Sequence, residues 1–399
     1  MTTPCAVRAV GVVSALGCGA DETWPRLVAA DQSCLTARDD LVPGRRLIVG
    51  EVRAALPALP QRLHRYACRT NQLALVALGQ IETPLRDVMK RTPADRVAVV
   101  MGTSTSGVAS AEQAIAHRGP GGALDPDFDC VQLEQGGVAE FVAAATGATG
   151  PVYTLSTACS SSAKALASAR ALLALGLCDA VVAGGADSLC GLTTNGFHAL
   201  RAIAAEPSNP FSVNRDGLTL GEGAAMFLLT RDPGGIQLAG AGEASDAFHM
   251  SAPDPEGAGA EIAMRAALDD AAVPPAAVSY LNLHGTGTPL NDAMESAAVH
   301  RLFGATLPCS STKPLVGHTL GAAGALELAF CWMMLERWRD GALPLLPHCW
   351  DGRTDPALPA LRFARVGEAI ALTNRALVMS NSFGFGGNNC ALLLGADER

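Results

Sequence analysis

The sequence predicts an α/β fold in which short buried strands alternate with helices. Three observations indicate this class: apolar runs that end in Gly or Ser, alanine-rich helical segments between them, and the same layout in a second part of the chain. The runs are continuously apolar rather than alternating, as in strands that are buried on both faces and pair in parallel. Two similar sets of elements indicate an internal duplication, joined near residues 231–235.

The expected elements follow one another regularly along the chain. Strands of the first part are expected at residues 6–17, 96–107, 151–161, 179–188 and 223–230. Strands of the second part are expected at 236–247, 279–288, 307–314 and 375–395. Helices are expected at 20–30, 71–81, 161–176, 260–273 and 321–338, which are rich in helix-forming Ala and Leu. Residues 117–129 are rich in Gly and Pro, which indicates an excursion at the surface. The duplication divides the chain into two expected domains, 1–232 and 233–399.

Composition argues against several classes of protein. The net charge of −9 is opposite to that of a typical nucleic-acid binder. No apolar run reaches the ~18 residues that a membrane span needs. The N-terminus, MTTPCAVRAVG, lacks the basic and apolar regions of a signal peptide. We therefore expect no membrane span, no nucleic-acid partner and a cytoplasmic location.

One of the twelve cysteines stands apart from the others. Their spacing is irregular and contains no C-x-x-C pair, so neither a metal site nor disulfides are expected. Most lie in apolar stretches, but Cys159 lies in STACSSS (156–162), just before an alanine-rich helix. The unpaired N–H groups at the start of a helix favour the nucleophilic thiolate. A Cys at such a turn is nevertheless structural more often than catalytic.

A histidine follows a strand of the second part. His284 ends an apolar strand and opens HGTGTPLND (284–292), at the kind of strand end where sites of α/β proteins gather. Thr286 and Thr288 are placed to hydrogen-bond an amide-bearing arm, or only the turn itself. The structural alternative is a turn histidine with satisfied hydrogen bonds.

A second histidine lies beside a lysine in STKPLVGHTLGAAGALE (311–327). Lys313 and His318 precede a helix of small residues in an apolar stretch. A buried lysine needs a partner because an unpaired buried charge is costly. Glu327 is the nearest candidate partner and Glu295 is another, while a lysine at the surface is the structural alternative.

The last motif is NSFGFGGNN (381–389), whose glycines surround Phe383 and Phe385. Such a loop either passes close to a ligand or forms a tight turn with core phenylalanines. Taken together and in order, TACSSS, HGTGTxxxD, KxxxGHxxGAAGxxE and NSFGFGGNN resemble the elongating β-ketoacyl-acyl-carrier-protein synthases, which have the thiolase fold. The resemblance runs from about residue 10 to the C-terminus and implies a duplicated five-layer α-β-α-β-α architecture.

The resemblance implies a role for each motif. It makes Cys159 the nucleophile of a Cys-His-His triad with His284 and His318, supported by an ion pair between Lys313 and Glu327. It also implies a set of substrate-binding residues, namely Thr286 and Thr288 on the phosphopantetheine arm, Gly384 and Phe385 in a gate over the acyl pocket, Phe383 beside the nucleophile, and Thr105 and Phe211 at the pocket.

The implied reaction is a decarboxylative condensation. The thiolate takes an acyl group from a carrier thioester, and malonyl-carrier protein then loses CO2 to give an enolate that attacks the acyl-enzyme. Imidazole N–H groups stabilise the enolate, and the N–H groups of Cys159 and Phe385 form the expected oxyanion hole. The resemblance implies no metal and no cofactor other than the 4′-phosphopantetheine that the carrier protein brings.

The implied macromolecular partners are an acyl carrier protein and a second subunit. Carrier proteins are acidic, so a basic docking patch is expected on this acidic chain. Arg62, Arg65 and Arg69 are spaced to share one face of a helix, and Arg201 matches a docking position by resemblance. A solvated basic face is the structural alternative. The related synthases dimerise, and we expect the strand at 179–188 to extend one sheet across both subunits.

Two departures from the primary fatty-acid enzymes indicate a specialised synthase. The segment around residues 205–216 is short, and Thr105 replaces the Gly or bulky aliphatic residue that often lines the acyl pocket. Both suggest polyene or polyketide-like chains, such as aryl polyenes, and ordinary fatty-acid elongation remains the main alternative. A coenzyme-A-dependent thiolase is disfavoured because Cys390 is followed by Ala-Leu rather than by x-Gly. A non-catalytic chain-length subunit is disfavoured by Cys159, although the chain is suited to be the active half of a heterodimer with one.

Overall fold

The strand order of the chain repeats. The computed structural model describes residues 3–398. The main strands of the first part are β1 (Ala6–Ser14), β5 (Val97–Gly102), β6 (Val152–Leu155), β7 (Ala180–Asp187) and β9 (Gly223–Thr230). Those of the second part are β10 (Gln237–Ser245), β11 (Tyr280–Asn282), β12 (Pro308–Ser310), β16 (Arg375–Gly384) and β17 (Asn388–Asp397). Their spatial orders, β6-β5-β7-β9-β1 and β12-β11-β16-β17-β10, both read third, second, fourth, fifth, first along the chain.

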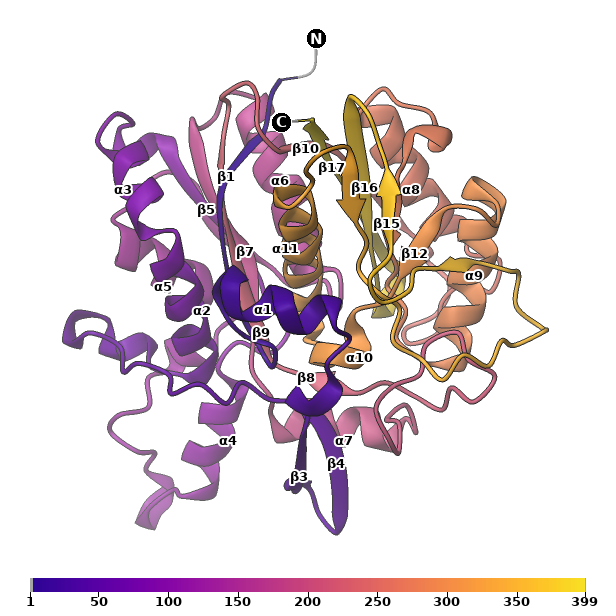
Figure 1. Cartoon of the computed structure of the whole chain (residues 1–399). Coiled ribbons are helices and arrows are strands. Elements are labelled where there is room, and N and C mark those ends of the chain that lie inside the picture. The colour runs from indigo at the N-terminus through magenta and orange to yellow at the C-terminus, as the bar shows by residue number, and fades with distance from the viewer. Residues whose placement is uncertain (1–2, 399) are drawn as a thin grey trace.

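The helices form three layers around these strands (Figure 1). The longer ones are α1 (Gly19–Val28), α2 (Arg69–Gln80), α5 (Gly137–Thr146), α6 (Ser161–Ala174), α8 (Ala258–Asp270), α9 (Pro289–Phe303) and α11 (Ala323–Glu336). α2 and α5 cover the outer face of the first part, α8 and α9 cover that of the second, and α6 and α11 lie between the two. This arrangement gives the five layers that the sequence predicts.

The shorter elements decorate this framework. The remaining helices are α3 (Glu82–Met89), α4 (Val108–Ala116), α7 (Gly191–Ala199) and α10 (Lys313–Val316). The remaining strands are β2 (Gly17–Cys18), β3 (Thr36–Val42), β4 (Arg45–Gly50), β8 (Leu220–Gly221), β13 (Ala342–Pro344), β14 (Arg362–Phe363) and β15 (Ala369–Ala371). The excursion at 117–129 is exposed over most of its length, as predicted.

Small residues bring the central layer together. α11 is apolar around its whole circumference, as expected of a helix with no solvent-facing side. A Cβ on Gly324 of α11 would lie 2.7 Å from the Cβ of Ala163 on α6, so this helix crossing requires glycine. The main core cluster joins α6 and α11 through residues such as Leu166 and Phe330. The two helices thus bring the ends of strands from both parts of the chain to one place.

The prediction of parallel pairing is right only for the outer strands of each part. β5 runs parallel to β6 and β7, and β11 runs parallel to β12 and β16. The inner strands β9, β1, β10 and β17 pair antiparallel. Residues 375–395, predicted as one strand, are the antiparallel hairpin β16–β17, because the glycines at 384–387 turn the chain back. Periodicity could not reveal this, since both arms of the hairpin are buried over most of their length and neither alternates between apolar and polar residues.

The predicted subunit contact falls on the wrong strand. β7, which covers the expected segment, pairs with β9 on one side and β5 on the other. It has no free edge and cannot extend the sheet into another subunit. The edge strand of the first part is β6.

The boundary between residues 232 and 233 lies in the link between β9 and β10, and the independence of the two domains stays a prediction.

Candidate active site

Cys159 lies on a strained turn between β6 and α6. The residue before it, Ala158, has a φ of 54°, a left-handed conformation that non-glycine residues rarely adopt. Such strain costs about 1–3 kcal/mol and persists only where neighbouring groups hold it. The hydroxyls of Ser104 and Ser161 hold it here by donating to the carbonyl of Ala158, at 3.0 and 2.6 Å. The turn directs the thiol toward the second part of the chain.

The resting thiol of Cys159 is protonated. Its burial raises the pKa to about 11, although the charge of Lys313 and the backbone N–H groups of Phe385 and Cys159 lower it. The prediction that the helix end keeps a thiolate is therefore wrong for the resting site. The loss of water around the sulfur outweighs the helix dipole and the nearby ammonium. A base is needed to form the thiolate of Cys159 at neutral pH.

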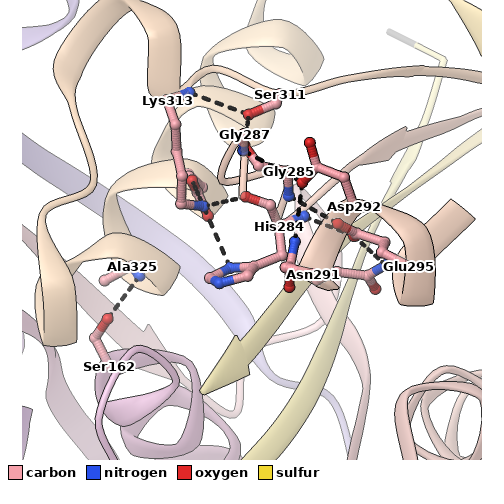
Figure 2. Close-up of polar contacts among 12 residues, drawn as sticks. Ser162, His284, Gly285, Gly287, Asn291, Asp292, Glu295, Ser311, Lys313 and Ala325 are labelled. Carbon is pink, nitrogen blue, oxygen red and sulfur yellow. Dashed lines mark hydrogen bonds and ion pairs between the residues drawn. The ribbon is translucent and has the colours of Figure 1, made fainter. Parts of the chain in front are cut away.

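His284 is held in a fixed orientation and tautomer (Figure 2). The buried carboxylate of Glu295 accepts the backbone N–H groups of His284 and Gly285, each at 2.7 Å. The ammonium of Lys313 donates to the carbonyl of His284 at 2.5 Å and lies 3.3 Å from its Nδ1. Because an ammonium has no acceptor, Nδ1 accepts and the ring proton lies on Nε2. His284 thus offers an N–H group to the site.

Lys313 takes Glu327 as its partner. Its Nζ lies 2.5 Å from Oε1 of Glu327, and both side chains are buried. Burial raises the pKa of Glu327 to about 7, and the charge of Lys313 opposes that rise. Glu295, the other candidate, instead holds the backbone at His284, and its burial raises its pKa to about 7.

His318 is the second histidine of the cluster. Among the described residues neither of its ring nitrogens has a hydrogen-bond partner, and the ring is 1% exposed. Burial, and after it the positive charge of Lys313, holds the pKa of His318 well below its usual range. Its ring meets that of His284 edge-on at a centroid distance of 5.4 Å. The lowered pKa keeps His318 neutral. The sulfur of Cys159 and one nitrogen of each histidine lie within 4.8 Å of one another.

The turn of the β16–β17 hairpin closes the site from the other side. The backbone N–H of Phe385 faces the sulfur of Cys159. The ring of Phe385 is 37% exposed and packs on Phe197 at 5.6 Å. Phe383 is buried, and its ring lies 6.0 Å from that of His284. One ring thus lies partly at the surface and the other inside the protein.

A cavity of about 280 Å³ opens onto Cys159. Its lining includes most of the predicted site, namely Cys159, His284, His318, Thr286, Thr288, Phe383, Gly384, Phe385 and Arg201. The hydroxyls of Thr286 and Thr288 lie 2.9 Å apart on one wall. The structure therefore brings together residues from segments that are distant in the sequence.

Two predicted lining residues do not line this cavity. The hydroxyl of Thr105 donates to the buried carboxylate of Asp187 at 2.6 Å, so its polar group is used in the interior. The ring of Phe211 packs against Phe363 at 5.4 Å and against His348 at 6.0 Å, within the core of the second part. Phe211 supports the turn after His284 from behind rather than facing a substrate in the cavity.

The predicted basic face is not continuous. Residues 61–66 form a 3-10 helix and Arg69 begins α2, so the prediction that Arg62, Arg65 and Arg69 share one helix face is wrong. Arg69 donates to the buried carboxylate of Glu222 at 2.8 and 2.5 Å, because that charge must be paired. Arg62 and Arg65 are exposed, and Arg201 lies at the mouth of the cavity.

Two further buried carboxylates hold the site and were given no role from the sequence. Asp292, in the first turn of α9, accepts the backbone N–H groups of Phe211 and Gly287. Asp187, the last residue of β7, accepts hydrogen bonds from several donors near the Cys159 turn. The sequence did contain a signal for both residues. Asp187 ends an apolar strand and Asp292 lies in the first turn of a helix, and a carboxylate that is buried at such a position requires hydrogen-bond donors.

Comparison with known proteins identifies the family. The N-terminal domain of beta-ketoacyl synthases matches residues 2–233, and the C-terminal domain of these enzymes matches residues 236–348. The chain belongs to the β-ketoacyl synthase family. It therefore has the thiolase-like fold and is an acyltransferase of the β-ketoacyl-acyl-carrier-protein synthase type, which condenses acyl groups to elongate a chain.

Relatives of this chain include curated proteins and solved structures. Nodulation protein E of Rhizobium meliloti (strain 1021) is 37% identical over 68% of both chains. The 3-oxoacyl-[acyl-carrier-protein] synthase 2 of the same strain is 30% identical over 97% of both chains. Among structures, the ketosynthase ApeO in complex with its chain length factor ApeC from Xenorhabdus doucetiae gives a TM-score of 0.92 at 42% identity, covering 99% of this chain and 98% of that one. None of the helices described between residues 3 and 398 is long and apolar enough to cross a membrane.

Proposed function

We propose that Cys159, His284 and His318 carry the condensation and that Lys313 and Glu327 hold them in register. The observation that supports this most directly is the convergence of one sulfur and two imidazole nitrogens within 4.8 Å at the end of a cavity. The protonation states of Cys159, His284 and His318 indicate which role each residue has. The thiol is protonated at rest, both rings are neutral, and neither ring nitrogen of His318 has a hydrogen-bond partner among the described residues.

In the first half-reaction the acyl group moves onto the enzyme. His318 takes the proton of Cys159, and the thiolate attacks the carbonyl carbon of the acyl-carrier thioester. The N–H groups of Cys159 and Phe385 hold the tetrahedral oxyanion. The C–S bond to the carrier breaks, and the carrier thiolate leaves with the proton from His318. A neutral His318 and an acyl-thioester on Cys159 remain.

In the second half-reaction the chain is lengthened by two carbons. Malonyl-carrier protein binds in the same cavity, its carboxylate leaves as CO2, and the electron pair becomes an enolate. The N–H groups of the two neutral imidazoles stabilise the enolate oxygen. The enolate carbon attacks the acyl carbonyl on Cys159, the C–S bond breaks, and β-ketoacyl-carrier protein leaves while Cys159 regains a proton from solvent.

The proposed substrates and partner follow from the cavity and from the relatives. Thr286 and Thr288 are suited to bond the amides of a 4′-phosphopantetheine arm, and Arg201 at the cavity mouth is suited to an acidic carrier protein. No further cofactor is needed, and the proposed location is the cytoplasm. The high similarity to a ketosynthase described with its chain length factor favours a role as the active subunit of such a pair, making polyene or polyketide-like chains.

The test is acylation of the protein by a panel of acyl-carrier proteins, followed by intact and peptide mass spectrometry. An acyl adduct on Cys159 is expected, and the preferred acyl group identifies the pathway. Cys159→Ala is expected to abolish condensation, while Cys159→Gln is expected to leave malonyl decarboxylation. Condensation at the wild-type rate in Cys159→Ala would remove Cys159 from the mechanism.

A further inference from the structure

Asp187 is a buried carboxylate that the reaction does not use. It ends β7, and none of its side chain is exposed. Its Oδ1 accepts the hydroxyls of Thr103 and Thr105, both at 2.6 Å, and the backbone N–H of Thr105 at 2.7 Å. The N–H of Ser104 is 3.0 Å from both carboxylate oxygens. Such a set of short bonds offsets part of the cost of burying the charge.

One side of this network leads to the nucleophile. The N–H of Ser104 binds Asp187, while its hydroxyl donates to the carbonyl of Ala158 at 3.0 Å. Ala158 is the strained residue immediately before Cys159. Asp187 therefore fixes the turn at 103–105, and that turn fixes the backbone that carries the sulfur.

The other side leads to the segment that carries His318. Oδ2 of Asp187 accepts the backbone N–H of Ala322 at 3.1 Å, at the start of α11. The chain runs from His318 through a single 3-10 turn to this point, and Glu327 follows one turn later. A Cβ on Gly321 would lie 2.7 Å from Oδ2, so only glycine admits so close an approach.

Unfavourable backbone conformations surround the carboxylate on both sides. Besides Ala158, Ser106 and Leu320 have φ values of 45° and 51°. Each such residue costs about 1–3 kcal/mol and requires neighbours that hold it. Asp187 binds directly the segments next to Ser106 and Leu320 and reaches Ala158 through Ser104, which makes it the common anchor of the strained backbone around the site.

We propose that Asp187 is a positioning residue that sets the distance between the Cys159 turn and the His318 segment. It joins the first part of the chain to the second through one side chain, with donors from both. This inference rests on the proposed roles of Cys159 and His318. Removal of the anchor lets the two segments shift, and a shift of about 1 Å costs on the order of 100-fold in rate.

The test compares Asp187→Asn and Ser104→Ala with a matched control, Glu112→Gln. An asparagine keeps one acceptor but presents an N–H₂ group to the N–H of Ala322 or Ser104, so it cannot serve both sides. Ser104→Ala removes only the link to Ala158 and keeps the buried charge. Glu112 likewise accepts two backbone N–H groups, those of Gly191 and Leu192, but at the start of α7.

Two measurements are made on each variant. The first is kcat and KM for condensation, and Asp187→Asn is expected to lower kcat by about 10- to 100-fold with KM within about threefold. The second is the rate of Cys159 alkylation by iodoacetamide, which needs no acyl substrate. Asp187→Asn and Ser104→Ala are expected to change that rate by about fivefold or more, and Glu112→Gln by less than twofold.

The outcomes separate this inference from the proposed function. Wild-type alkylation rates and kcat in both Asp187→Asn and Ser104→Ala would overturn the positioning role. If Asp187→Asn does not fold, Ser104→Ala decides alone, by the same criterion. Altered alkylation in a protein that forms no acyl adduct would support the positioning role while refuting the proposed function.

Discussion

The ammonium of Lys313 lies 2.5 Å from a carboxylate oxygen of Glu327, with no more than 2% of either side chain exposed. The same ammonium donates to the carbonyl of His284 and directs the proton of that ring to Nε2. One buried cation thus sets the tautomer of His284, helps to keep both imidazoles neutral, and lowers the pKa of Cys159. The pair is therefore expected to matter more for activity than for stability.

Replacement of both partners separates these contributions. Lys313→Met leaves the Glu327 carboxylate buried without a cation, which is expected to cost about 3–5 kcal/mol of unfolding free energy. Lys313→Met with Glu327→Leu is expected to recover most of that stability and none of the condensation activity. Chemical denaturation and a condensation assay measure the two quantities. Recovery of activity in the double variant would contradict the role of the ammonium.

The pH dependence of Lys313→Met has a defined sign. Burial already raises the pKa of Glu327 from 4.5 to about 7, and the loss of Lys313 raises it further. A carboxyl whose pKa is higher in the folded than in the unfolded protein stabilises the fold when protonated, and that contribution disappears as the pH rises. Lys313→Met is therefore expected to be more stable, relative to wild type, at pH 5 than at pH 8. Equal differences at both pH values would contradict a buried unpaired carboxylate.

The thiol of Cys159 provides a second test by pH. Because its pKa is raised to about 11, the thiolate fraction is expected to grow about tenfold per pH unit between pH 7 and 10. The rate of alkylation by iodoacetamide is expected to follow that rise, with the adduct located by peptide mass spectrometry. In Lys313→Met the profile is expected to shift to higher pH, because the ammonium lowers the pKa of the thiol. A plateau below pH 8 would indicate a resting thiolate.

Replacement of His318 and replacement of His284 are expected to impair different half-reactions. His318→Ala removes the proposed base, so acylation of Cys159 is expected to slow by about 10²- to 10⁴-fold. His284→Ala leaves that base and is expected to acylate at a rate nearer to wild type, while losing most malonyl decarboxylation. Rapid-quench mass spectrometry follows acylation, and CO2 release follows decarboxylation. Equal losses of acylation in both variants would contradict the division of roles.

Much of this fold was predictable because its signals are local. Apolar runs located β1, β5, β7, β9 and β10, and alanine-rich stretches located α6 and α11. Strand direction was not predictable in the same way, because an apolar run has no sign that distinguishes parallel from antiparallel neighbours. The hairpin at 375–397 and the paired edges of β7 depend on long-range hydrogen bonds that no local pattern records.

Site residues were predictable from the sequence where they belong to a short motif. They were not predictable where the interaction partner of a side chain is distant in the sequence. Cys159, His284 and His318 come from turns whose glycines and hydroxyls mark them. Arg69 looked like a surface cation because its partner, Glu222, is 153 residues away. Thr105 looked like a lining residue because its acceptor, Asp187, lies on a different strand. Desolvation of Cys159 depends on the whole fold and reversed the expected state of the thiol.

The edge strand β6 offers the last test, of the subunit contact. The carbonyls of Pro151, which precedes β6, and of Leu155 at its end accept the N–H groups of Val99 and Thr103. By alternation, the N–H of Thr154 therefore points to the free edge. Thr154→Pro removes that donor without touching a bond to β5 and is expected to block the addition of a strand from a second subunit. Wild-type protein is expected to be a dimer by light scattering at micromolar concentration, with itself or with a related subunit, and the variant is expected to dissociate. Arg201→Ala serves as the matched control: it is expected to remain dimeric while its KM for carrier protein rises, with a smaller difference at high salt. A dimer in Thr154→Pro would place the contact elsewhere on the chain.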